Sequence, residues 1–83
     1  MNNKTSTSNE AQRQRLLTHL REKGSICTSE AREQLAVMSP APRVLELRRE
    51  GWKIATVMQQ IADDAGVLHR QALYVIQRGE EAA

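Results

Sequence analysis

The sequence predicts an α+β domain of three helices followed by a C-terminal β-hairpin, with space for a very short strand after the first helix. Three observations lead to this class. Apolar residues recur at helical spacing between Ala11 and Glu50, the spacing changes to two after Gly51, and the glycines lie between these segments or beyond them.

The length and composition indicate one small folded unit. The chain has 83 residues, and apolar residues make up 40% of it without a single Phe, so we expect an aliphatic core with Trp52 as its largest side chain. Residues 1–8 are polar and aperiodic, which predicts a disordered N-terminal tail. We expect residues 9–78 to form the domain and residues 79–83 to form a loose C-terminal tail.

Charge and cysteine content indicate where the protein resides. The formal net charge is only +2, and Cys27 is the single cysteine, so no intrachain disulfide forms. No apolar run reaches the ~18 residues of a membrane span, and the N-terminus lacks the hydrophobic segment of a signal peptide. We therefore expect a cytoplasmic protein without a membrane partner, in which Cys27 is a small buried side chain.

The first helix is expected to begin at Thr7, whose spacing from Glu10 matches a capping box, and to continue through AQRQRLLTHLREK. Its buried stripe consists of three leucines, Leu16, Leu17 and Leu20. Gly24 would end this helix, and residues 25–27 fit the short strand.

The second helix is expected to start with Thr28 as its N-cap, and Glu30 in its first turn suits the positive end of the helix dipole. Ala31 and Leu35 are four residues apart and therefore share one face. Residues 36–38 would then form a corner.

The third helix is expected to have Ser39 as its N-cap and Pro40 at its first position, where a missing N–H costs nothing. Val44 and Leu47 would face inward, and Gly51 would stop the helix. A short helix, a turn and a second helix with one buried face form a helix-turn-helix pattern.

The hairpin is expected to pair a strand that begins at Trp52 with a strand from Val67 to Gln77, across a turn at residues 63–66. A two-residue loop at Asp64 and Ala65 would place Leu73 and Val75 on the face of Trp52. A three-residue loop with Gly66 in the left-handed conformation would instead place there Ala72, Tyr74 and Ile76.

We favour the three-residue loop, because Gly66 lies where a G1 bulge needs it. The outward face of the hairpin then carries Val57, Leu73 and Val75, which is more apolar surface than a solvated face requires. Helix, short strand, helix, helix and hairpin together give the element order of a winged helix, with the hairpin as the wing.

The run QRQRLLTHLREKGSICTSEAREQLAVMSPAPRVLELRREGWKI resembles the small winged helix-turn-helix domains of phage and prophage origin in bacteria. In that family a first helix ends in Gly, a Ser/Thr-rich cap follows, and the recognition helix leads into a segment like R-V-x-E-L-R-x-x-G-W. The wing end with His69, Arg70 and Tyr74 is also similar. The resemblance covers Ala11 to Gln77 and implies a DNA-binding transcriptional regulator. The chain departs from this pattern at the wing tip, which carries Asp63 and Asp64 and no basic residue before His69.

The predicted interface places the helix of residues 39–50 in the major groove of double-stranded DNA and the wing of residues 57–70 along the backbone. Arg43 lies in the first turns of that helix, where a guanidinium can bind guanine or phosphate. The candidate DNA-binding residues are Thr28, Ser39, Arg43, Glu46, Arg49, His69 and Arg70.

No pattern for catalysis, a metal or a cofactor is present: His19, His69 and Cys27 lack ligand spacing, and the dispersed glycines form no phosphate loop. We therefore expect a protein that is not an enzyme. A small domain covers little DNA, so a homodimer through Val57, Leu73 and Val75 is a further expectation. The alternative is a winged helix that binds protein instead of DNA, which the low net charge and the acidic wing tip favour.

Overall fold

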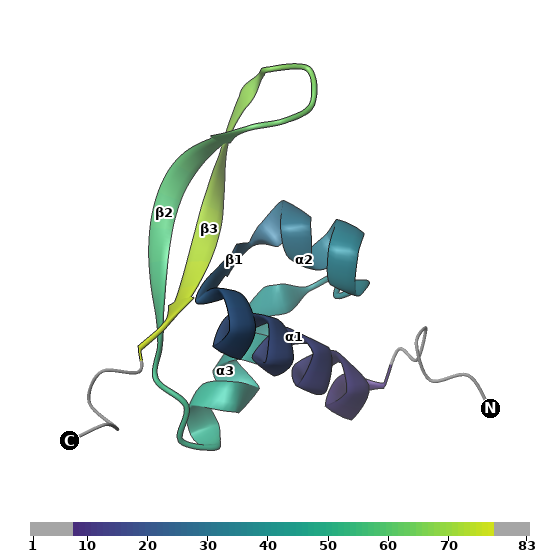
Figure 1. The fold of residues 1–83 in the computed structure, drawn as a ribbon, viewed down its shortest axis with the longest axis vertical. Coiled ribbons are helices and arrows are strands. Elements are labelled where there is room, and N and C mark those ends of the chain that lie inside the picture. Colours follow the sequence, from purple (N-terminus) through teal and green to yellow (C-terminus); the bar gives the residue numbers. More distant parts are fainter. Residues whose placement is uncertain (1–7, 78–83) are drawn as a thin grey trace.

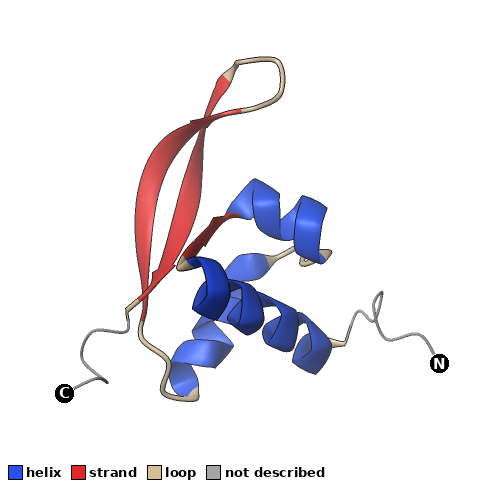
Figure 2. Cartoon of the chain, in the orientation of Figure 1, coloured by secondary structure: helices blue, strands red, loops and turns tan. Residues whose placement is uncertain are grey.

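A computed structural model describes residues 8–77 as three helices and three strands. Their order is α1 (Asn9–Lys23), β1 (Ser25–Cys27), α2 (Thr28–Leu35), α3 (Pro40–Arg49), β2 (Ile54–Ala62) and β3 (Leu68–Ile76). The strands form one antiparallel sheet in the order β1-β3-β2, and the far part of the β2–β3 hairpin extends past the helices (Figure 1, Figure 2). The predicted α+β class and the short first strand are confirmed.

The N-cap of helix α1 lies one residue after the predicted cap, Thr7. The N-cap is Ser8, whose Oγ accepts a hydrogen bond from the Ala11 N–H at 3.1 Å, although Ser8 was assigned to the tail. Thr7, the predicted cap, lies outside the described residues, as do most of the two predicted tails. Gly24 ends the helix as predicted: its φ is 95°, and its N–H donates to the Leu20 carbonyl at 2.8 Å.

The predicted cap of α2 is wrong by one residue. Cys27 is the N-cap, and Thr28 is already the first helical residue. The reason is that strand β1 runs directly into the helix, so the extended backbone that an N-cap needs belongs to the last strand residue. The Glu30 carboxylate accepts a hydrogen bond from the Cys27 N–H at 3.1 Å, which stabilises this tight connection.

The corner between α2 and α3 begins at a left-handed residue and continues with a buried side chain. Ala36 has a φ of 57°, and the following Val37 is buried and donates its N–H to the Ala31 carbonyl at 3.0 Å. Ser39 occupies the N-cap of α3 as predicted, but its hydroxyl makes no capping hydrogen bond. Gly51, with a φ of 107°, follows the helix end and turns the chain toward β2.

The core lies between the helices and one face of the sheet. All three helices, strand β1 and the corner before α3 contribute its fully buried aliphatic side chains, and the hairpin adds Ile54, Tyr74 and Ile76. Trp52 is only partly buried and packs at the edge of this cluster, with the Arg21 guanidinium 5.4 Å from its ring centroid. The prediction of Trp52 as the largest core side chain is therefore wrong, because β2 begins at Ile54 and Trp52 belongs to the preceding loop.

The favoured register of the hairpin is confirmed. Thr56 lies opposite Tyr74 and Met58 opposite Ala72, so the second strand turns the predicted residues toward the core face. Gly66 has a φ of 84°, and the Asp63 N–H donates to the Val67 carbonyl at 2.9 Å, which closes a three-residue loop. Strand β1 pairs with β3 on its other edge and makes β3 the central strand.

Candidate nucleic-acid interface

The core face of the hairpin continues beyond the core as an exposed surface. Side chains alternate between the two faces of a strand, so the residues that follow Ile54 and precede Ile76 at even spacing share the core side. On this surface β2 presents Thr56, Met58 and Gln60, and β3 presents Leu68, Arg70 and Ala72.

Helix α2 places an arginine beside this part of the hairpin. Thr28 and Arg32 are four residues apart on α2, and both line a cavity whose opposite wall contains Met58 and Arg70. The Arg32 Nε donates to the Met38 carbonyl at 2.9 Å, so the corner before α3 adjoins the same surface. The sequence alone does not bring Arg32 and Arg70 together, because no local pattern shows that α2 packs next to the wing.

Helix α3 completes the surface from the other side. Arg48 donates to the Ile54 carbonyl and to the Thr56 Oγ1, both at 2.7 Å, and these bonds attach the end of α3 to the start of β2. Leu45 and Arg49 lie on the same exposed side of α3. We call the exposed residues of α2, α3 and the hairpin described here the basic face; it consists of Arg32, Arg48, Arg49, Arg70, Met38, Leu45 and Met58.

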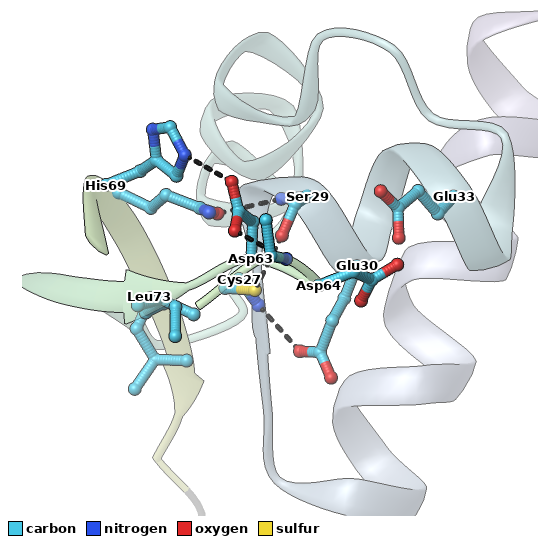
Figure 3. A pocket seen from close by; sticks show the side chains of 12 residues that line it. Cys27, Ser29, Glu30, Glu33, Asp63, Asp64, His69 and Leu73 are labelled. Carbon is cyan, nitrogen blue, oxygen red and sulfur yellow. Dashed lines mark hydrogen bonds and ion pairs between the residues drawn. The ribbon is translucent and has the colours of Figure 1, made fainter. Parts of the chain in front are cut away.

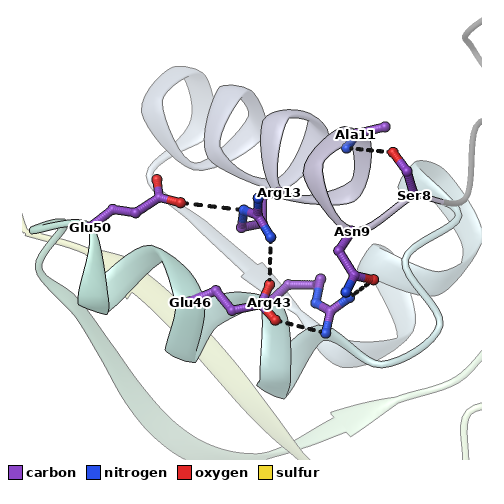
Figure 4. Close-up of polar contacts among 7 residues, drawn as sticks. All are labelled: Ser8, Asn9, Ala11, Arg13, Arg43, Glu46 and Glu50. Atoms are coloured by element: carbon purple, nitrogen blue, oxygen red, sulfur yellow. Dashed lines mark hydrogen bonds and ion pairs between the residues drawn. The ribbon is translucent and has the colours of Figure 1, made fainter.

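Two of the predicted contacts lie elsewhere. Arg43 and Glu46 face α1, where the Arg43 guanidinium bonds to Asn9 and to the Glu46 carboxylate at 3.0 Å (Figure 4). Arg13 joins this ion-pair cluster with contacts of 2.9 Å to Glu46 and 3.3 Å to Glu50. Only 14% of the Arg43 side chain is exposed, so its guanidinium holds α1 against α3.

The other predicted residues are distributed over the interface. Arg49 and Arg70 belong to the basic face, Thr28 lines its cavity, and Ser39 is exposed at the start of α3. Prolines occupy the first and third positions of α3, which removes two of the backbone donors that a helix N-terminus would offer to a phosphate. An anion at this helix end would therefore depend on the Ser39 hydroxyl more than on the backbone.

Asp63, one of the two acidic residues by which the wing tip departs from the family pattern, organises the wing tip. The Asp63 carboxylate accepts hydrogen bonds from the Ala65 and Val67 N–H groups, both at 2.9 Å, and lies 2.7 Å from the His69 Nε2. The hydrogen bond to His69, together with the backbone bonds, lowers the pKa of Asp63 below its ordinary value of 3.8. His69, a predicted DNA contact, is thus part of the turn.

This arrangement predicts that acid loosens the wing tip. Because folding lowers the pKa of Asp63, its contribution to loop order is present above pH 3.8 and is lost as the pH falls through the lowered value. Asp63→Ala should produce the same loosening at neutral pH. Hydrogen exchange should quicken at the Ala65 and Val67 amides, while exchange in α1 stays unchanged. Equal exchange in the variant and the parent protein would contradict this role.

A second cavity lies on the other side of the wing and is acidic (Figure 3). Its walls combine the start of α2 with the wing tip, and its lining includes the acidic residues Glu30, Glu33, Asp63 and Asp64. The remaining acidic residues of the described segment 8–77 lie on α1 or in the ion-pair cluster between α1 and α3. The acidic side chains of this segment therefore lie outside the basic face, which carries four exposed arginines, while other basic residues pair with acidic ones between α1 and α3 or lie on α1.

Within residues 8–77, no group of three or more His, Cys, Asp or Glu side chains is arranged to hold a metal ion. None of the helices in this segment has the length and apolar character needed to cross a membrane.

Comparison with known proteins supplies one match. Neither the curated proteins nor the solved structures contain a significant match to this chain. The family described as the winged helix-turn-helix domain matches residues 11–79, which is most of the sequence and includes every element except the first two residues of α1. Members of such a family are typically DNA-binding modules, and the exposed arginines of the basic face agree with that use. The element order, the sheet topology and this match together show that the chain belongs to the winged helix-turn-helix domain family.

Proposed function

We propose that this chain is a sequence-specific DNA-binding protein that regulates transcription, of the type found in phages and prophages, and that it acts in the bacterial cytoplasm. The exposed side of α3 enters the major groove of double-stranded DNA, and the wing lies along the backbone. The observation that carries this proposal is the basic face, where four exposed arginines from α2, α3 and β3 surround one surface while the acidic side chains lie elsewhere. Arginines in this arrangement suit the phosphates on both sides of a groove.

The proposal assigns different tasks to the predicted contact residues. Arg49 and Arg70 bind phosphate, with Thr28 and Ser39 as neutral hydroxyl contacts beside them. His69 contributes through the turn that it forms with Asp63. We assign Arg43 and Glu46 to the contact between α1 and α3, because their charged groups already bind each other and α1.

An amide chemical-shift titration with a random-sequence duplex at low salt tests this function. The expected result is a set of shifts at the basic face, around Arg32 on α2, on the exposed side of α3 and in the hairpin, that fades as salt is added because counterions are released on binding. Absence of shifts at about millimolar DNA, a concentration above the Kd of ordinary non-specific binding, would overturn the proposal. That outcome would favour the alternative of a winged helix that binds protein.

We further propose that the protein binds DNA as a homodimer through the outward face of the hairpin. Val57 is 41% exposed there and lies opposite Leu73, with Val75 two residues further along the central strand. An apolar strip of this kind across the outward face of β2 and β3 is suited to a second copy, and a dimer would double the DNA contacts. Sedimentation should give a concentration-dependent dimer that Val57→Glu converts into a monomer. A strict monomer at about 100 μM, well above the Kd of ordinary stable dimers, would exclude it.

A further inference from the structure

The exposed side of α3 is apolar where a recognition helix meets the bases. In helix-turn-helix proteins the N-terminal residues of the recognition helix contact the base edges. Here the exposed positions of the first two turns are Ala41, Pro42 and Leu45, none of which donates or accepts a hydrogen bond through its side chain. Arg43 and Glu46, the polar residues of the same turns, bind each other and face α1.

The following arginines are placed for the backbone of DNA. Arg48 donates hydrogen bonds to the Ile54 carbonyl and the Thr56 Oγ1, and Arg49 is the last residue of α3. Arg32 and Arg70 lie on α2 and the wing, beyond the edges of α3. The charged groups therefore surround the helix, and its central exposed side chain is Leu45, which is 45% exposed.

Base chemistry limits what such a helix can read. In the major groove each base pair offers hydrogen-bond donors and acceptors, and the only apolar group among them is the C5-methyl of thymine. A leucine placed against polar base edges would remove their water without replacing its hydrogen bonds, which is unfavourable. A leucine against a thymine methyl buries apolar surface on both partners, which is favourable.

We infer that Leu45 is a specificity-determining residue that recognises the C5-methyl group of thymine in the major groove. This inference rests on the proposed DNA binding and adds to it the chemical group that is read. Met38 and Met58, which are 59% and 49% exposed, lie on the same basic face and extend the apolar contact toward neighbouring bases. A cytosine methylated at C5 presents its methyl group at the same position, so the same side chain should accept it.

The experiment compares duplexes that differ only in methyl groups. Selection from a random duplex library provides a bound sequence, and each thymine in it is then replaced in turn by deoxyuridine, which pairs identically but lacks the methyl group. We expect about a fourfold loss of affinity at one or two positions, the effect of one buried methyl group. At the same position, a duplex with 5-methylcytosine opposite guanine should bind more tightly than a duplex with unmethylated cytosine opposite guanine.

A pair of variants identifies the side chain responsible. In Leu45→Ala the ratio of thymine to deoxyuridine affinity should fall to about one, because the methyl group loses its contact. The substitution removes an exposed side chain from a helix and replaces it with the best helix former, so the fold is retained. The matched control is Val67→Ala, an apolar truncation of a 55% exposed residue in the wing loop, and it should keep the ratio of the parent protein.

The outcomes separate this inference from the proposed function. Salt-dependent binding with no effect of any deoxyuridine, or a thymine preference that persists in Leu45→Ala, would overturn the role of Leu45 and leave DNA binding intact. Failure to bind any duplex would overturn both, and would indicate that the exposed apolar residues of the basic face serve a protein partner.

Discussion

Leu20→Ala is expected to lower the free energy of unfolding by about 2–5 kcal/mol. Leu20 is fully buried on α1 and belongs to the cluster in which α1, α3 and the sheet meet. Alanine removes most of this side chain and leaves a cavity that a small core cannot refill. Because a domain of this size has only about 5–10 kcal/mol of stability in total, the variant would lose a large share of it.

Chemical denaturation followed by circular dichroism measures this effect, with Leu45→Ala as the matched control. Both variants remove the same atoms from a helical leucine, but Leu45 is exposed and its replacement should change stability by less than about 0.5 kcal/mol. The loss of unfolding free energy in Trp52→Ala should lie between the losses in these two variants, since Trp52 is only partly buried at the edge of the core. Equal destabilisation by Leu20→Ala and Leu45→Ala would contradict the packing described here.

The double variant Arg49→Ala with Arg70→Ala is expected to weaken DNA binding roughly tenfold to a hundredfold near 0.1 M salt. Each arginine that contacts a phosphate releases about one counterion, so the slope of log affinity against log salt should become shallower by about two. Both residues are exposed and neither takes part in the ion-pair cluster between α1 and α3, so the fold should remain intact.

The matched control is the double variant Arg21→Ala with Lys23→Ala. These residues lie in the last turn of α1 and do not belong to the basic face, and their removal changes the net charge by the same amount. A general effect of charge would reduce binding equally in both double variants, whereas phosphate contacts at the basic face would change the salt slope only for Arg49 and Arg70. Fluorescence anisotropy with one duplex over a range of salt concentrations distinguishes the two cases.

Much of this fold could be predicted from the sequence because it depends on local chemistry. Gly24 and Gly51 have positive φ and end their helices, and Pro40 is tolerated only near a helix start, so these boundaries are encoded by single residues. The hairpin register was also predictable, because Gly66 permits the left-handed conformation that a three-residue loop requires. Each of these features involves residues that are close together in the chain.

The candidate site was harder to predict, because its residues meet only through tertiary contacts. A helical pattern shows that Arg43 and Glu46 avoid the face of Val44 and Leu47, but it does not distinguish solvent from a neighbouring helix. The structure shows that α1 covers that side and binds both charges. Arg32 shows the reverse case. Nothing in the local sequence distinguishes it from other exposed residues, and it belongs to the basic face only because α2 packs beside the wing.

The sequence by itself determined the element order, the helix ends, the hairpin loop and therefore the winged-helix class, since short-range steric and hydrogen-bonding preferences decide these features. The tertiary structure alone decided which arginines stabilise the scaffold and which remain available to a ligand. It also decided that Trp52 lies at the edge of the core and that Leu45 is the central exposed side chain of α3. The physical reason is that burial and charge pairing depend on neighbours from distant parts of the chain, which no local pattern specifies.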